Sequence, residues 1–80
     1  MTNNVIEFHA ARLDAIETAI QRLAISISET GGAKAQELDE TVLYFRNKIK
    51  EPDLPAYERD VCIRTVRLLD PLGVDPLSQY

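Results

Sequence analysis

Hydrophobic residues recur at heptad spacing through the first third of the chain. Between residues 4 and 29 they lie alternately three and four positions apart, which places them on one stripe of an α-helix. The stripe comprises Ile6, His9, Leu13, Ile16, Ile20, Leu23, Ile27 and Thr30. No proline or glycine interrupts it, and Gly31-Gly32 follows with the residue type that most easily closes a helix. The pattern predicts a long amphipathic helix over residues 4–29, with Asn4 as its N-cap.

A second apolar pattern follows the glycine pair and predicts a helix over residues 33–50. Its apolar seam comprises Ala35, Leu38, Val42, Phe45 and Ile49. Acidic residues lie in its first half and basic residues in its last turns, the order that a helix dipole favours. Because a short connection makes neighbouring helices antiparallel, the first two seams are expected to face one another, with facing residue numbers summing to about 63.

Two prolines, Pro52 and Pro55, end the second pattern and redirect the chain. A third helix is predicted over residues 54–69, with Asp53 as its N-cap. Its broad apolar face comprises Tyr57, Val61, Cys62, Thr65, Val66, Leu68 and Leu69, with Ile63 partly off this face. The tail, residues 70–80, repeats Asp-Pro-Leu and is unusually apolar for a free end. The sequence leaves two interpretations of the tail: it packs on its own chain, or it docks onto another chain.

These elements predict an all-α fold in a single domain, residues 1–80: an antiparallel helical hairpin plus a third helix, forming a small three-helix bundle. In that hairpin the start of the first helix has no partner within the chain, so a two-fold dimer is expected. The interface is expected to include this start, an isoleucine off the main seam and the apolar tail. The candidate interface residues are Val5, Ile6, Phe8, His9, Ile25, Leu72, Val74, Leu77 and Tyr80.

Charge argues against a nucleic-acid partner. The 80 residues include 13 acidic and 9 basic ones, giving a net charge of −4, whereas nucleic-acid binding normally requires a basic surface. A helix-turn-helix-like DNA regulator is therefore only the third hypothesis. The lone cysteine suits a reducing compartment, and neither a signal segment nor a membrane span is visible in the sequence, so a cytoplasmic protein is expected.

Few side chains offer chemistry. With one cysteine and one histidine, the chain can form neither an internal disulfide nor a zinc cluster. Cys62 on an apolar helix face is interpreted as a small hydrophobe rather than a nucleophile with His9 as its base. The most site-like feature is the arginine cluster Arg59, Arg64 and Arg67, which could bind a carboxylate or phosphate. A solvated helix face, with Asp60 paired to Arg64, explains the same residues.

Glycine-rich phosphate loops, paired catalytic carboxylates and Cys-x-x-Cys spacing are absent from the sequence. We therefore expect neither enzymatic activity nor a cofactor or metal. The preferred hypothesis is a non-enzymatic protein–protein interaction module, such as a small adaptor or an inhibitor of a larger protein. The alternative is a small-ligand or nucleotide-binding oligomer that uses Arg59, Arg64 and Arg67.

Overall fold

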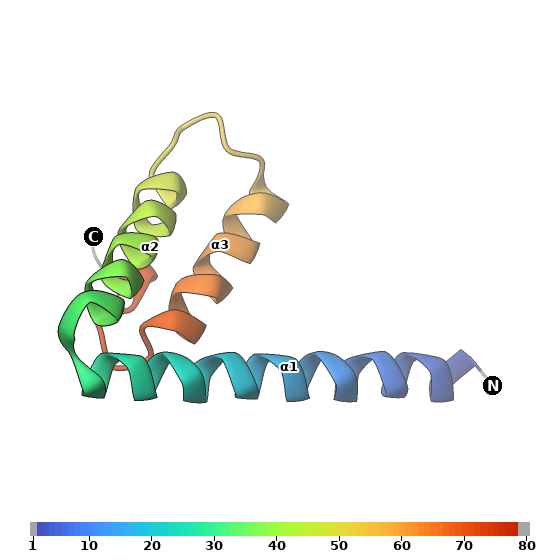
Figure 1. The fold of residues 1–80 in the computed structure, drawn as a ribbon. Helices are drawn as coiled ribbons and strands as arrows, with labels where there is room; N and C mark the ends of the chain where they lie inside the picture. The colour runs from blue at the N-terminus through green and yellow to red at the C-terminus, as the bar shows by residue number, and fades with distance from the viewer. Residues whose placement is uncertain (1, 79–80) are drawn as a thin grey trace.

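The computed structural model describes residues 2–78, and every regular element among them is helical. Helix α1 spans Thr2–Thr30, α2 spans Gly32–Ile49, α3 spans Ala56–Leu69, and the short 3₁₀ helix η1 spans Pro76–Ser78 (Figure 1). This confirms the predicted all-α class with three helices. Two predicted N-caps are wrong. Asn4 lies inside α1, which starts before it, and Pro55 rather than Asp53 occupies the N-cap position of α3.

The turn between α1 and α2 depends on its two glycines. Gly31 and Gly32 have φ angles of 74° and 78°, in the left-handed region that other residues rarely adopt. The Gly31 N–H donates to the carbonyl of Ile27 at 3.2 Å, which closes the last turn of α1. After this turn α2 leaves α1 at a steep angle instead of folding back along it (Figure 1).

The antiparallel hairpin is formed by α2 and α3, not by α1 and α2 as the sequence predicted (Figure 1). Backbone hydrogen bonds of the connection include Glu51 N to Lys48 O at 3.1 Å and Leu54 N to Glu51 O at 3.3 Å. Arg59 then reaches back from α3: its Nε donates to the carbonyl of Ile49 at 3.1 Å and its Nη2 to that of Glu51 at 2.8 Å. These bonds satisfy carbonyls that the end of α2 leaves without intrahelical partners.

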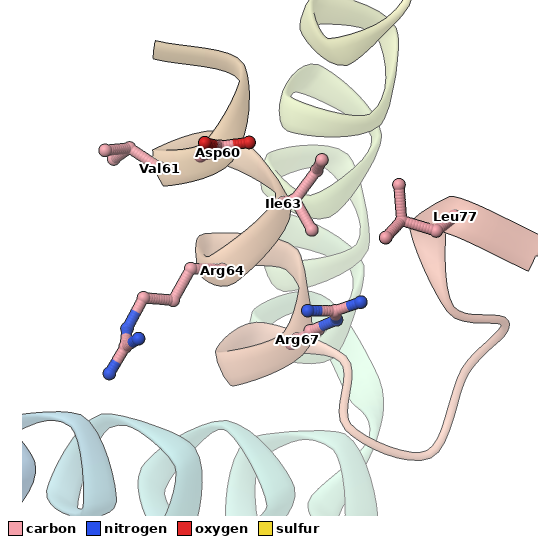
Figure 2. A pocket seen from close by; sticks show the side chains of 6 residues that line it. All are labelled: Asp60, Val61, Ile63, Arg64, Arg67 and Leu77. Atoms are coloured by element: carbon pink, nitrogen blue, oxygen red, sulfur yellow. The ribbon is translucent and has the colours of Figure 1, made fainter. Parts of the chain in front are cut away.

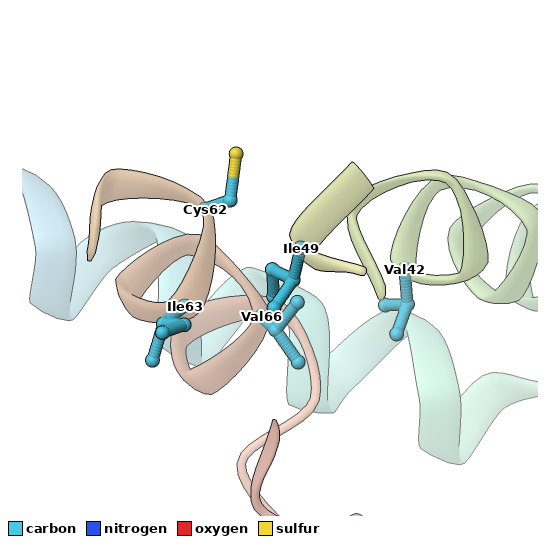
Figure 3. Close-up of a cluster of buried hydrophobic side chains, with 5 residues drawn as sticks. All are labelled: Val42, Ile49, Cys62, Ile63 and Val66. Atoms are coloured by element: carbon cyan, nitrogen blue, oxygen red, sulfur yellow. The ribbon is translucent and has the colours of Figure 1, made fainter. Parts of the chain in front are cut away.

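The buried core lies between α2 and α3. It comprises Val42, Ile49, Cys62, Ile63 and Val66, with Leu38, Phe45 and Leu69 packed half-buried against it (Figure 3). The predicted α2 seam is therefore buried at Val42 and Ile49 and half-buried at Leu38 and Phe45, but it packs against α3. Ile63 is buried although it was expected partly off the apolar face, whereas Tyr57 and Val61 are exposed. Cys62 is buried and free.

The predicted contact between the seams of the first two helices is wrong. Leu13, Ile16, Ile20 and Leu23 have exposed fractions of 51, 48, 38 and 63%. The face of α1 turned to the hairpin instead includes Ala24, which is 3% exposed, and the half-buried Glu17 and Gln21. At about 100° per residue, that face lies roughly 100° around the helix from the apolar seam. The physical reason is that the α2 seam is already covered by α3, whose C-terminal end also meets α1 (Figure 1).

The tail packs on its own chain as far as residue 78. Arg46 of α2 donates from Nη2 to Asp70 Oδ2 and to the carbonyl of Val74, each at 2.8 Å. Pro76 in η1 is buried. Each Asp-Pro pair thus supplies an aspartate to an arginine of the bundle, because Asp75 accepts two hydrogen bonds from Arg67.

Candidate interaction surface

An apolar strip of α1 faces solvent. It comprises Ile6, Leu13, Ile16, Ile20 and Leu23, and we call it the α1 stripe. Val5 and Phe8 beside it are also exposed, and the Phe8 ring meets that of His9 edge to face at a centroid distance of 5.7 Å. The N-terminal half of α1 extends beyond α2 and α3 (Figure 1). A contiguous exposed apolar strip of this kind is typical of an interaction surface.

An ion pair pins α3 to α1 along one edge of this stripe. Nε and Nη2 of Arg64 donate to the two carboxylate oxygens of Glu17, a bidentate arrangement. The hydrogen bonds from Arg64 hold the pKa of the Glu17 carboxyl below its ordinary value, and the same bonds raise the pKa of Arg64. One edge of the stripe is therefore held against α3 by the Glu17–Arg64 ion pair, whose residues are 47 positions apart in the sequence.

The three arginines of the alternative hypothesis do not converge. Arg59 binds backbone carbonyls and Arg64 binds Glu17. Arg67 Nε donates to Asp75 Oδ2 at 2.9 Å and Nη2 to Oδ1 at 3.2 Å. These bonds, with a further one from the Leu77 N–H, lower the pKa of Asp75. Arg64 and Arg67 point to opposite sides of α3 (Figure 2).

A depression of about 350 Å³ opens between α3 and the tail. Its lining residues are Asp60, Val61, Ile63, Arg64, Arg67 and Leu77 (Figure 2). Both of its arginines are already bonded to carboxylates, so their contacts do not favour anion binding there. Among residues 2–78, no group of three or more His, Cys, Asp or Glu side chains is placed to hold a metal ion.

The candidate interface residues occupy two separate places. Val5, Ile6, Phe8 and His9 are exposed at the free end of α1. Leu72, Val74 and Leu77 are exposed on the tail, at the other end of the molecule, so the two groups do not form one surface (Figure 1). Ile25 is half-buried beside a cavity of about 40 Å³ that Leu69 and Leu72 also line. Tyr80 lies outside the described residues.

The candidate interface predicted from the sequence includes only Ile6 of the five stripe residues, because Leu13, Ile16, Ile20 and Leu23 are predicted to lie in the interior. The available signal was the heptad spacing itself, which is as typical of a coiled coil between chains as of a bundle within one. Arg46 was also missed as a tail anchor. The only signal in the sequence was the carboxylate of Asp70 in the tail, which could accept from any arginine of the chain.

Fold and surface together define the class: a small three-helix protein with one long helix whose apolar stripe faces solvent. Comparison of the chain with models of known protein families, with curated proteins and with solved structures finds no match. Among the described residues, no helix combines the length and the apolar character needed to cross a membrane.

Proposed function

We propose that this chain is a non-enzymatic protein–protein interaction module and that the α1 stripe is its docking surface. The observation that supports the proposal is the exposure of five heptad-spaced Ile and Leu residues on one face of a long helix. An amphipathic helix that binds a partner through one apolar face uses side chains at this spacing as anchors.

The energy available from the stripe is large enough for binding but needs a matching partner. Full burial of an Ile or Leu side chain yields about 1.5–3 kcal/mol, and the five stripe residues are roughly half exposed. Completing their burial would therefore contribute roughly 4–8 kcal/mol. Association costs an estimated 4–15 kcal/mol, so the partner must contribute a comparable apolar surface. A polar partner surface would not suffice.

Site-specific photo-crosslinking tests this proposal. A photoreactive phenylalanine analogue replaces Leu13 in the stripe, and in a matched control variant it replaces Leu43, an exposed leucine on α2. We expect protein adducts from position 13 in cells, identified by mass spectrometry, and few from position 43. Ile16→Glu in the same chain should abolish the adducts, because it places a charge within the stripe. Equal adduct yields from positions 13 and 43 would refute the proposed surface.

A further inference from the structure

We propose that the partner of the α1 stripe is a second copy of this chain, paired antiparallel along α1 about a two-fold axis. This inference rests on the proposed function, because it names the partner of the same surface. Two features of the molecule support it: the register of the stripe and the position of the α2–α3 hairpin.

The stripe is self-complementary in one antiparallel register. When the numbers of facing residues sum to 29, Ile6 faces Leu23 of the second copy, His9 faces Ile20, and Leu13 faces Ile16. A two-fold axis repeats each of these contacts, so that every stripe residue gains a partner. Alanines at positions 10 and 19 flank the seam on either side and allow the two helices to approach closely.

The hairpin position is compatible with this pairing. The α2–α3 hairpin stands on the C-terminal half of α1, and the N-terminal half extends beyond it (Figure 1). In the antiparallel pair, the extended half of each α1 lies against the half of the other α1 on which a hairpin stands. The two hairpins then lie at opposite ends of the pair. A parallel pair would place both hairpins at the same end. The N-terminal halves of both α1 helices would then extend beyond the hairpins.

Charges at the edge of the stripe are compatible with the antiparallel orientation. The Arg64 side chain over Glu17 is 65% exposed. In the antiparallel register Ala10 of the second copy lies opposite Glu17, so no further carboxylate is brought against this ion pair. In a parallel pair Arg12 of the second copy would face Glu17, the usual spacing for an interhelical ion pair. The Glu17 carboxylate already accepts two hydrogen bonds from Arg64, so Arg12 of the second copy would share a carboxylate that is already paired.

Sedimentation equilibrium tests the identity of the partner. We expect the purified wild-type chain to dimerise at micromolar concentrations. Ile16→Glu should raise the dissociation constant by about 100-fold or more, since it places a charge in the central layer of both copies. Leu43→Glu, the same kind of change on α2, should leave the constant within about threefold. Circular dichroism should report unchanged helicity for both variants, because both positions are exposed in the single chain.

The orientation is tested by the distance between two identical spin labels. The label is attached to Glu29→Cys in a Cys62→Ala background. In the antiparallel register the two labelled sites are offset by 29 residues, or about 44 Å along the axis. A parallel pair with helices about 10 Å apart would give roughly 10–20 Å. A distance in the shorter range would overturn the antiparallel pairing, and a dimer that survives Ile16→Glu would overturn the stripe as its interface.

The inference and the proposed function can fail separately. A wild-type chain that stays monomeric throughout the micromolar range overturns the second copy as partner. If position 13 still crosslinks to a different protein, the docking surface stands and only the identity of its occupant changes. If position 13 crosslinks no more than position 43 does, and the chain is monomeric, both fail.

Discussion

Two isoleucine truncations should have very different costs, although they remove the same atoms. Ile49 is 5% exposed and packs in the core between α2 and α3, so Ile49→Ala should destabilise the chain by about 2–5 kcal/mol. Ile20 in the α1 stripe is 38% exposed. Its truncation leaves no closed cavity in the single chain and should cost about 1 kcal/mol.

The assay is urea unfolding followed by circular dichroism at two protein concentrations, one below and one well above the dissociation constant of the dimer. The proposed dimer would stabilise the wild type by about 2.7 kcal/mol when the concentration exceeds that constant 100-fold. Ile20→Ala weakens the dimer, so its deficit should increase with concentration. The deficit of Ile49→Ala should stay nearly constant. Equal losses at the low concentration would refute the reasoning, because they would place Ile20 in the core of the single chain.

Three further predictions concern the ion pairs. Arg46→Leu leaves Asp70 without its guanidinium and should cost about 1–3 kcal/mol in urea unfolding, less than a fully buried pair because Asp70 is partly exposed. A Cβ atom at Gly73 would collide with the Asp70 carboxylate, so Gly73→Ala should weaken the same pair. Its cost should therefore be less than additive with that of Arg46→Leu in a double-mutant cycle. The pKa values of Glu17 and Asp75 are lower in the folded chain. The stability from their ion pairs should be full above the ordinary carboxyl pKa of about 4 and lost as pH falls through the lower folded pKa. An acid titration of Glu17→Gln should show a shallower loss than the wild type, and identical slopes would contradict the assignment.

Helix positions followed from local signals, which is why the sequence located them within a few residues. The heptad and seam spacings mark helices, and Gly31-Gly32 and the two prolines mark their ends. Which helices pair along their length is not a local property. All three have an apolar face, and the rule that a short connection gives antiparallel neighbours was applied to the glycine turn. With both glycines at positive φ, that turn directs α2 steeply away from α1, and the next connection forms the hairpin instead.

The candidate ligand site also depends on contacts between distant parts of the chain, which the sequence pattern does not predict. Arg64 and Arg67 are three residues apart, so the sequence grouped them on one face of α3. In the structure each guanidinium is drawn toward a different carboxylate, Glu17 on α1 or Asp75 in the tail. Glu17 is 47 positions away from Arg64 in the sequence. The tail brings Asp75 to Arg67, and Arg46 on α2 holds the tail through Asp70 and the Val74 carbonyl. Spacing alone identifies which side chains share a face but not which charges meet them.

The way α3 docks on α1 gives the strongest physical reason to expect a partner for the stripe. The face of α1 that α3 and the tail cover includes Ala24, the polar residues Glu17 and Gln21, and the half-buried Ile25. Rotating α1 by roughly 100° would bring the Ile and Leu side chains under α3 and bury more apolar area within the chain. The bidentate Glu17–Arg64 pair opposes that rotation, because it would be broken and its carboxylate left without its guanidinium. A long helix that holds its own chain beside Ala24 and keeps its apolar stripe outward is the observation on which the proposed docking surface rests.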